Sequence, residues 1–172
     1  VEVIDDNDHT VVLQVGAGEN WDELVFYGVE NNWWGIENMS HIPGSVGGVP
    51  VQNVGAYGQE GGDVIQSVTV YDRKEKIFKT LTHEQCDFRY RKSIFNTEEK
   101  GRYIILTVRF VLEKHGEPHI KYPDLQKYFK DKKPGEIKIE EIRNAIISIR
   151  DAKLPLPSKI PNTGSFFKNV II

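Results

Sequence analysis

The segment IPGSVGGVPVQNVGAYGQEGGD (residues 42–63) carries seven glycines, two prolines and no lysine or arginine. Glycine adopts positive φ and lets the backbone approach a ligand closely, so such a run can aim several peptide N–H groups at one anion. A loop that binds phosphate without basic side chains must use these amides, as enzymes do when they hold the pyrophosphate of a dinucleotide. The glycine pattern alone leaves a long surface loop rich in turns as the alternative.

Two further segments contain residues that could do chemistry. Arg91 lies in CDFRYRKSIF (residues 86–95), and the planar fork of a guanidinium can pair with two oxygens of a carboxylate or enolate at once. Ser165 follows a glycine in KIPNTGSFFKN (residues 159–169). Taken alone, an arginine in a basic cluster is a surface residue and a serine beside glycine belongs to a turn. The residue types therefore leave both roles open.

Together with the glycine-rich loop, these segments closely resemble, in the same order, the bacterial UDP-N-acetylenolpyruvoylglucosamine reductase family. These flavoenzymes make UDP-N-acetylmuramate for peptidoglycan. The resemblance implies FAD as cofactor, NADPH as hydride donor, a small-molecule UDP-sugar substrate, no metal, and a cytoplasmic location in a bacterium. The segments KYPDLQKYF and RDAKLPLP are similar to those of the subclass with a mobile tyrosine loop. The other matching segments are GAGENWDELV (16–25), GIENMSHIPGSVG (35–47) and IKYPDLQKYF (120–129).

The resemblance also implies roles for individual residues. Ser165 matches the serine that donates a proton to the substrate, and Arg91 matches the arginine that stabilises the enol intermediate. The family's other catalytic acid, a glutamate near its C-terminus, matches no residue here. Substrate contacts are implied for Tyr90, Tyr122, Lys153 and Asn169. We expect the glycine-rich loop to hold the FAD pyrophosphate with backbone amides through Gly44, Ser45, Val46, Gly47, Asn53, Gly55, Ala56 and Tyr57.

The charge distribution is uneven and leaves other functions open. Residues 1–72 contain 12 acidic residues and no basic one, whereas all 22 lysines and arginines follow, among 13 acidic residues. A basic half that holds an anionic small molecule explains this, and so does a non-catalytic module that binds an anionic partner. Another oxidoreductase of the same flavin fold is the third interpretation. No aromatic-plus-basic motif of an RNA-binding fold is present, so we expect no nucleic-acid partner.

The composition is that of a single globular domain. Of 172 residues, 39% are hydrophobic and 27% charged, and the mean hydropathy is −0.43. No apolar run approaches the roughly 18 residues of a membrane span, and no signal peptide is evident. The single cysteine, Cys86, excludes an internal disulfide and fits a reducing compartment. The histidines and acidic residues lack metal-ligand spacing, so we assign no metal.

Hydrophobic periodicity and capping residues predict the elements that must position these groups. The chain opens in a strand, and further strands are predicted over residues 10–15, 64–71, 77–81 and 103–112. The last is expected to be buried on both faces or central in a sheet, because its alternation is poor. Helices are predicted over residues 20–31 with Asn20 as N-cap, 82–85 with a capping box, 122–130 and 139–152.

Strands outnumber helices and are joined by hairpins, which predicts an α+β fold with a largely antiparallel sheet and flanking helices. A doubly wound fold would need Gly-x-Gly-x-x-Gly after the strand, but Trp21 stands where the third glycine belongs. The resemblance implies the FAD-binding fold shared with vanillyl-alcohol oxidase, here incomplete. We expect residues 1–154 to be part of this domain, with the tyrosine loop near 115–135. Residues 155–172 would begin a truncated substrate-binding domain, so the chain reads as an internal fragment.

Overall fold

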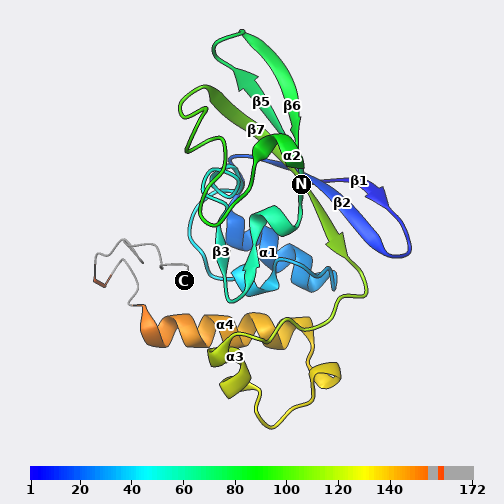
Figure 1. Cartoon of the computed structure of the whole chain (residues 1–172). Helices are drawn as coiled ribbons and strands as arrows, with labels where there is room; N and C mark the ends of the chain where they lie inside the picture. The colour runs from blue at the N-terminus through cyan, green and yellow to red at the C-terminus, as the bar shows by residue number, and fades with distance from the viewer. Residues whose placement is uncertain (155–158, 161–172) are drawn as a thin grey trace.

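A five-stranded antiparallel sheet forms the centre of the computed structural model, which describes residues 1–154 and 159–160 (Figure 1). The strand order is β1-β2-β7-β5-β6, so β7 is the middle strand. All four pairings are antiparallel, which confirms the predicted α+β fold. The strands are β1 (Glu2–Asp6), β2 (Thr10–Gly16), β5 (Ile65–Asp72), β6 (Ile77–Thr82) and β7 (Tyr103–Glu113).

The helices begin where the capping residues predict. The Asn20 side chain accepts a hydrogen bond from the Glu23 N–H, and Thr82 and Gln85 form both bonds of the capping box before α2. The α-helices are α1 (Trp21–Glu30), α2 (His83–Cys86), α3 (Pro123–Tyr128) and α4 (Ile139–Lys153). The short piece η1 (Glu37–Met39) precedes the glycine-rich loop, which contains η2 (Val46–Gly48), β3 (Gly55–Ala56), β4 (Gln59–Glu60) and η3 (Gly61–Asp63); η4 (Pro134–Glu136) precedes α4.

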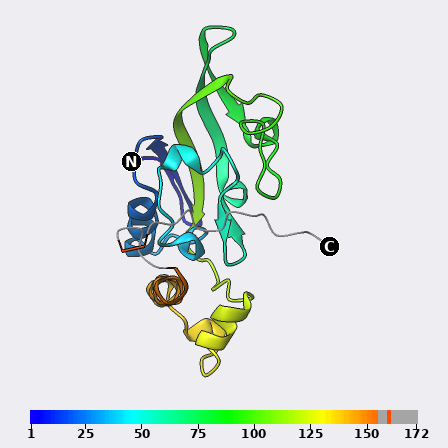
Figure 2. The same cartoon turned by 90° about the vertical axis from the view of Figure 1, so that its left-hand side faces the viewer.

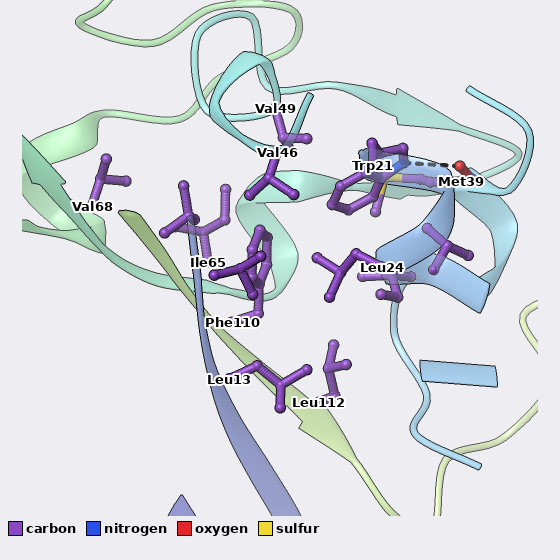
Figure 3. Packing of buried hydrophobic residues seen from close by; sticks show 14 of the residues in the cluster. Leu13, Trp21, Leu24, Met39, Val46, Val49, Ile65, Val68, Phe110 and Leu112 are labelled. Atoms are coloured by element: carbon purple, nitrogen blue, oxygen red, sulfur yellow. Dashed lines mark hydrogen bonds between the residues drawn. The ribbon is translucent and has the colours of Figure 1, made fainter. Parts of the chain in front are cut away.

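The main core lies between the sheet and α1 (Figure 3). Trp21, the first residue of α1, is 1% exposed and packs against Phe110 of β7, with 5.9 Å between the ring centroids. Its indole Nε1–H donates to the backbone oxygen of Met39 at 3.0 Å. A buried indole needs such a partner for its polar atom. The tryptophan therefore fixes α1 against the sheet and holds the segment just before the glycine-rich loop.

The middle strand differs from the prediction in one respect. β7 is central, as expected, but Ile104 and Leu106 are 51% and 36% exposed, so the strand is not buried on both faces along its length. A register shift lies opposite Thr69 and Val70, where the partner residue jumps from Thr107 to Ile105. Such a bulge inverts the side-chain alternation. It explains the poor alternation of the sequence.

The helices α3 and α4 form a second layer below α1 in Figure 1, and α4 contacts α1 and η1 (Figures 1 and 2). This layer has its own core, in which Trp34 also packs against the main core. The Arg143 guanidinium on α4 donates to both carboxylate oxygens of Asp22 on α1, at 2.7 and 2.9 Å. Arg150 donates to the backbone oxygen of His41 at 3.1 Å. Buried members of the second core are Leu125, Phe129, Ile137, Ile142, Ala145 and Ile146.

Candidate functional site

Two glycine segments meet backbone to backbone beside the first turn of α1. The Gly47 N–H donates to the Ala17 oxygen at 2.9 Å, and the Val46 N–H donates to the Glu19 oxygen at 2.9 Å. A Cβ added to Gly47 would lie 2.7 Å from the Ala17 Cβ, closer than any side chain can approach. Glycine is therefore required at position 47 for the two segments to touch.

The outer edge of this junction is open. A Cβ added to Gly18, Gly44 or Gly48 would meet no atom within 4 Å, and all three glycines are exposed. Within the described part of the chain, the N–H groups of Gly44 and Ser45 donate to no other group. We call Gly18, Gly44, Ser45 and Gly48 the glycine cradle. Its exposed backbone carries no side chain larger than that of serine, which lets an anionic group approach closely.

These backbone hydrogen bonds reduce the number of loop amides that could bind a pyrophosphate. The amides of Val46, Gly47 and Gly48 already donate to backbone oxygens of the protein. The Val46 side chain lies fully inside the main core. Of the residues predicted at this end of the loop, Gly44 and Ser45 are thus the ones whose amides make no bond within the described residues, while Val46 and Gly47 hold the loop in place.

The next part of the loop is fixed from within by Asn53. This residue is fully buried, and its Oδ1 accepts from the Gly62 N–H at 2.7 Å while its Nδ2 donates to the Arg89 oxygen at 3.2 Å. Its φ of +46° lies in the left-handed region, which asparagine tolerates better than most residues. Asn53 therefore shapes the loop through its side chain.

Arg91 joins the hairpin of β3 and β4 to the segment before β7. Its Nη1 donates to the Asn53 oxygen at 3.2 Å and its Nη2 to the Gly55 oxygen at 2.5 Å. The Glu60 carboxylate lies 3.9 Å from Nη1, and the guanidinium stacks over the Tyr90 ring at 4.9 Å. A Cβ on Gly55 would lie 2.9 Å from Nη1. The arginine is thus held in one orientation with its side chain 26% exposed.

At the turn of the same hairpin, Tyr57 meets the predicted tyrosine loop. Its ring packs edge-on against Tyr122, with 5.1 Å between centroids. Lys153 of α4 donates to the Asp124 carboxylate at 2.5 Å, and this bond raises the pKa of Lys153. Burial raises the pKa of Tyr57, against the opposing effect of the positive charges on Arg150 and Lys153. Tyr122 and Lys153, distant in sequence, therefore share one cationic corner with Tyr57.

The described residues predicted to act together thus lie along one continuous path. It runs from the glycine cradle through Asn53, Gly55, Ala56 and Tyr57 of the loop, with Arg91 and Tyr90 near Gly55 and with Tyr122 and Lys153 near Tyr57. Ala56 pairs with Gln59 across the hairpin. Ser165 and Asn169 lie outside the described residues.

Sequence reasoning missed several members of this region. Gly18 and Gly48 face the open edge, although a Gly16-Ala17-Gly18 turn was visible in the sequence. Glu60 lies beside Arg91, and nothing in the sequence pairs the two. Asn38 and Gln59 form a buried network under the hairpin, but no pattern distinguishes them from surface amides.

Other parts of the described structure offer weaker candidates for a functional site. Among the residues that the structure describes, no group of three or more histidine, cysteine or acidic side chains could hold a metal ion. None of the described helices has the length and apolar character needed to cross a membrane. A depression of about 420 Å³ beside β6 is lined by Lys79 and Arg102. Both already bond to the buried Asp72 carboxylate, and the Arg102 bond holds the pKa of Asp72 well below its ordinary value.

Comparison with known proteins agrees with this geometry. A family model described as an FAD binding domain matches residues 1–81. The chain is 45% identical over 168 residues to a UDP-N-acetylenolpyruvoylglucosamine reductase from Amoebophilus asiaticus, covering 98% of this chain and 49% of that protein. A reductase of the same name from Neisseria meningitidis serogroup C is 43% identical, covering 96% of this chain and 48% of that protein.

The fold also has a match among solved structures. The UDP-N-acetylenolpyruvylglucosamine reductase of Thermus caldophilus superposes with a TM-score of 0.58 at 23% identity, over 82% of this chain and 44% of that one. The chain spans about half the length of the curated relatives it matches. Over nearly its whole length the chain is similar to UDP-N-acetylenolpyruvoylglucosamine reductases, and its first half matches an FAD binding domain.

Proposed function

We propose that the full-length protein uses FAD and NADPH to reduce the enolpyruvyl group of UDP-N-acetylglucosamine enolpyruvate, giving UDP-N-acetylmuramate for peptidoglycan. The observation that carries the proposal is the glycine cradle, an exposed backbone edge with two amides that make no bond within the described residues, on the same loop that Arg91 and Tyr122 contact. Residues 1–154 would belong to the FAD-binding domain and residues 155–172 to the start of the substrate domain. A cytoplasmic location and the absence of a metal stay predictions.

The residues present fit FAD in that the cradle offers amides and no negative side chain at Gly18, Gly44, Ser45 or Gly48. When bound, FAD would accept a hydride from NADPH and deliver it to the substrate double bond. The Gly44 and Ser45 amides would bind a pyrophosphate oxygen, because a backbone N–H directed at an oxyanion forms a charge-assisted hydrogen bond. The remaining loop residues would keep this edge rigid.

The substrate would be held at two points. Lys153 and Tyr122 would bind the diphosphate, since an ammonium answers its charge and a phenol can donate to a phosphate oxygen. Arg91 would stabilise the negative charge that develops on the substrate, and its fixed orientation lowers the reorganisation needed at that moment. We propose Ser165 as the proton donor, with Tyr90 and Asn169 contacting the substrate.

The test is made on the full-length protein. We expect it to purify with FAD, visible as a flavin absorbance band, and to oxidise NADPH only when the enolpyruvyl substrate is added. A colourless protein that stays inactive after FAD is supplied would contradict the proposal and favour a non-catalytic module. A yellow protein active on another sugar or alcohol instead would favour a different oxidoreductase of this fold.

A Ser165→Ala variant tests the proposed proton donor. Bleaching of the flavin band by NADPH needs no proton from serine, so its rate should stay close to that of the unchanged protein. Turnover of the enolpyruvyl substrate should fall by about 10²–10⁴, the effect of losing a positioned general acid. Turnover within a few-fold of the unchanged protein would remove Ser165 from the mechanism.

A further inference from the structure

A buried polar cluster lies under the β3–β4 hairpin, away from the proposed ligand contacts. Glu37 and Asn38 of η1 and Gln59 of β4 are 1%, 0% and 9% exposed. The Gln59 Nε2 donates to a Glu37 carboxylate oxygen at 2.7 Å, and the Asn38 backbone N–H donates to the Gln59 Oε1 at 2.8 Å. Buried polar groups are stable only when they are paired in this way. The cluster therefore behaves as one rigid unit.

Asn38 extends this unit to two separate loops. Its Nδ2 donates to the Tyr57 backbone oxygen at 2.9 Å and to the His119 backbone oxygen at 2.8 Å. A side-chain amide has two N–H donors, and both are used here. Tyr57 belongs to the glycine-rich loop, whereas His119 lies three residues before Tyr122. One side chain thus links the loop proposed to hold FAD with the loop proposed to hold substrate.

The orientations of the Gln59 and Asn38 side-chain amides follow from their hydrogen bonds. The Glu37 carboxylate accepts from the Gly35 N–H and from Gln59, at 2.7 Å each. A carboxylate accepts only, so Gln59 must turn its NH₂ toward Glu37 and its oxygen toward the Asn38 N–H. The Asn38 Oδ1 is buried without a partner among the described residues. Exchanging the positions of the Asn38 oxygen and nitrogen would break the bonds to both the Tyr57 and the His119 carbonyls. The orientation that leaves the oxygen unpaired is therefore the one in which both N–H groups donate.

The two linked carbonyls lie close in sequence to the two tyrosine rings that meet, Tyr57 and Tyr122. Tyr57 has a φ of +49°, a left-handed conformation that is uncommon for a bulky residue and needs support from its surroundings. Its carbonyl is held by Asn38 while its ring packs on Tyr122. The loops are also in close contact nearby, because a Cβ on Gly58 would lie 3.4 Å from the His119 ring.

We propose that Asn38 is a positioning residue that couples the glycine-rich loop to the tyrosine loop and so places Tyr122 for substrate binding. Asn38 is fully buried, so it acts through Tyr57 and Tyr122. The substrate part of this inference rests on the proposed function, whereas the coupling between the two loops does not.

The first test needs no reaction. In the full-length protein, Asn38→Ser replaces the two N–H donors with one shorter hydroxyl, which can donate to only one of the two carbonyls, and introduces no charge. Amide hydrogen exchange should become faster in residues 55–60 and in residues 119–128 together, because the two loops lose their shared link to the cluster. Asn31→Asp is the matched control, since Asn31 donates in the same way to the Tyr27 oxygen at 2.8 Å but on the surface. Unchanged exchange in residues 119–128 of the Asn38→Ser protein would overturn the proposal.

The second test separates positioning from stability. Asn38→Asp should raise the substrate KM by about tenfold to a hundredfold, as expected when a binding group is displaced by around an ångström. The value of kcat and the FAD content should change less than about twofold, and Asn31→Asp should leave KM unchanged. If Asn38→Asp fails to fold, the same measurements on Asn38→Ser replace it. A fall in kcat at unchanged KM would overturn the positioning role.

A double variant asks whether Asn38 acts through Tyr122. Combining Asn38→Ser with Tyr122→Phe should raise KM less than the product of the two single effects, because coupled residues are not additive. Multiplicative effects would overturn the coupling. If the full-length protein without substitutions does not turn over the substrate, the proposed function is contradicted. The hydrogen-exchange experiment would still decide whether Asn38 couples the two loops.

Discussion

Individual side chains show how closely the core and the glycine-rich loop are joined. Trp21 is buried, packs on Phe110 and donates to the Met39 oxygen, so its loss leaves a cavity and an unpaired carbonyl. Trp21→Ala should lower the free energy of unfolding by about 3–5 kcal/mol. Urea denaturation of the full-length protein measures this. Phe78→Ala is the control, because Phe78 is 71% exposed, and a comparable loss in the control would contradict the assignment.

Cys86 illustrates a residue whose chemistry is suppressed by its surroundings. Its side chain is fully buried, and burial raises the pKa of the thiol to about 12. A thiol with such a pKa is protonated at neutral pH and is a poor nucleophile. Cys86 therefore acts as a small apolar side chain of the main core.

At the scale of elements, the α4 helix is held on α1 by charge as well as by apolar contact. Burial alone would raise the pKa of Asp22, but hydrogen bonds from Arg143 and the His41 N–H outweigh it and hold this pKa below its ordinary value. A carboxyl with a lowered folded-state pKa contributes stability above its unfolded pKa of about 3.9, and that contribution is lost as the pH falls through the folded-state pKa.

Because the pKa of Asp22 is lowered in the folded protein, its contribution to stability should depend on pH. Asp22→Asn should lower the free energy of unfolding by about 1.5–3 kcal/mol at pH 7, the range for a hydrogen bond to a charged group. The difference between the two proteins should shrink below about pH 4 as Asp22 becomes protonated in the unchanged protein. Urea unfolding between pH 2.5 and 7 would measure it. A difference that stays constant with pH would show that the ion pair contributes nothing.

The same scale shows what the sequence could predict and why. Helices and strands were found because their signals are local: the Asn20 cap, the capping box at Thr82, and the apolar spacing of α4. The docking of α4 on α1 depends on Arg143 and Asp22, which are 121 residues apart. No local pattern encodes such a pairing. The bulge in β7 likewise blurred its alternation, so its exposed Ile104 was missed.

The candidate site divides in the same way. The glycine-rich loop and Arg91 were recognised from motifs, and the structure brings them into contact. It could not be foreseen that Asn53 and Val46 would turn their side chains inward, or that Gly48 would face outward. Those orientations are set by backbone hydrogen bonds between segments distant in sequence, such as Gly47 to Ala17.

Considered as a whole, the chain is an FAD-binding fold whose two cores meet at Trp34 and whose glycine-rich loop runs along their junction. It spans about half the length of its curated relatives. The central claim about the molecule is that the open glycine edge is the place where FAD binds. A side chain added to this edge should therefore block FAD binding, although the fold itself leaves room for it.

The most direct test is to place a side chain on that edge in the full-length protein. Gly48 lies in η2 with no atom within 4 Å of an added Cβ and without positive φ, so Gly48→Val should fold. Gly135→Val is the matched control, because Gly135 also lies in a 3-10 turn with open space around it, away from the loop. We predict that Gly135→Val purifies with stoichiometric FAD by absorbance and that folded Gly48→Val purifies with little or none. Stoichiometric FAD in the Gly48→Val protein would contradict the account.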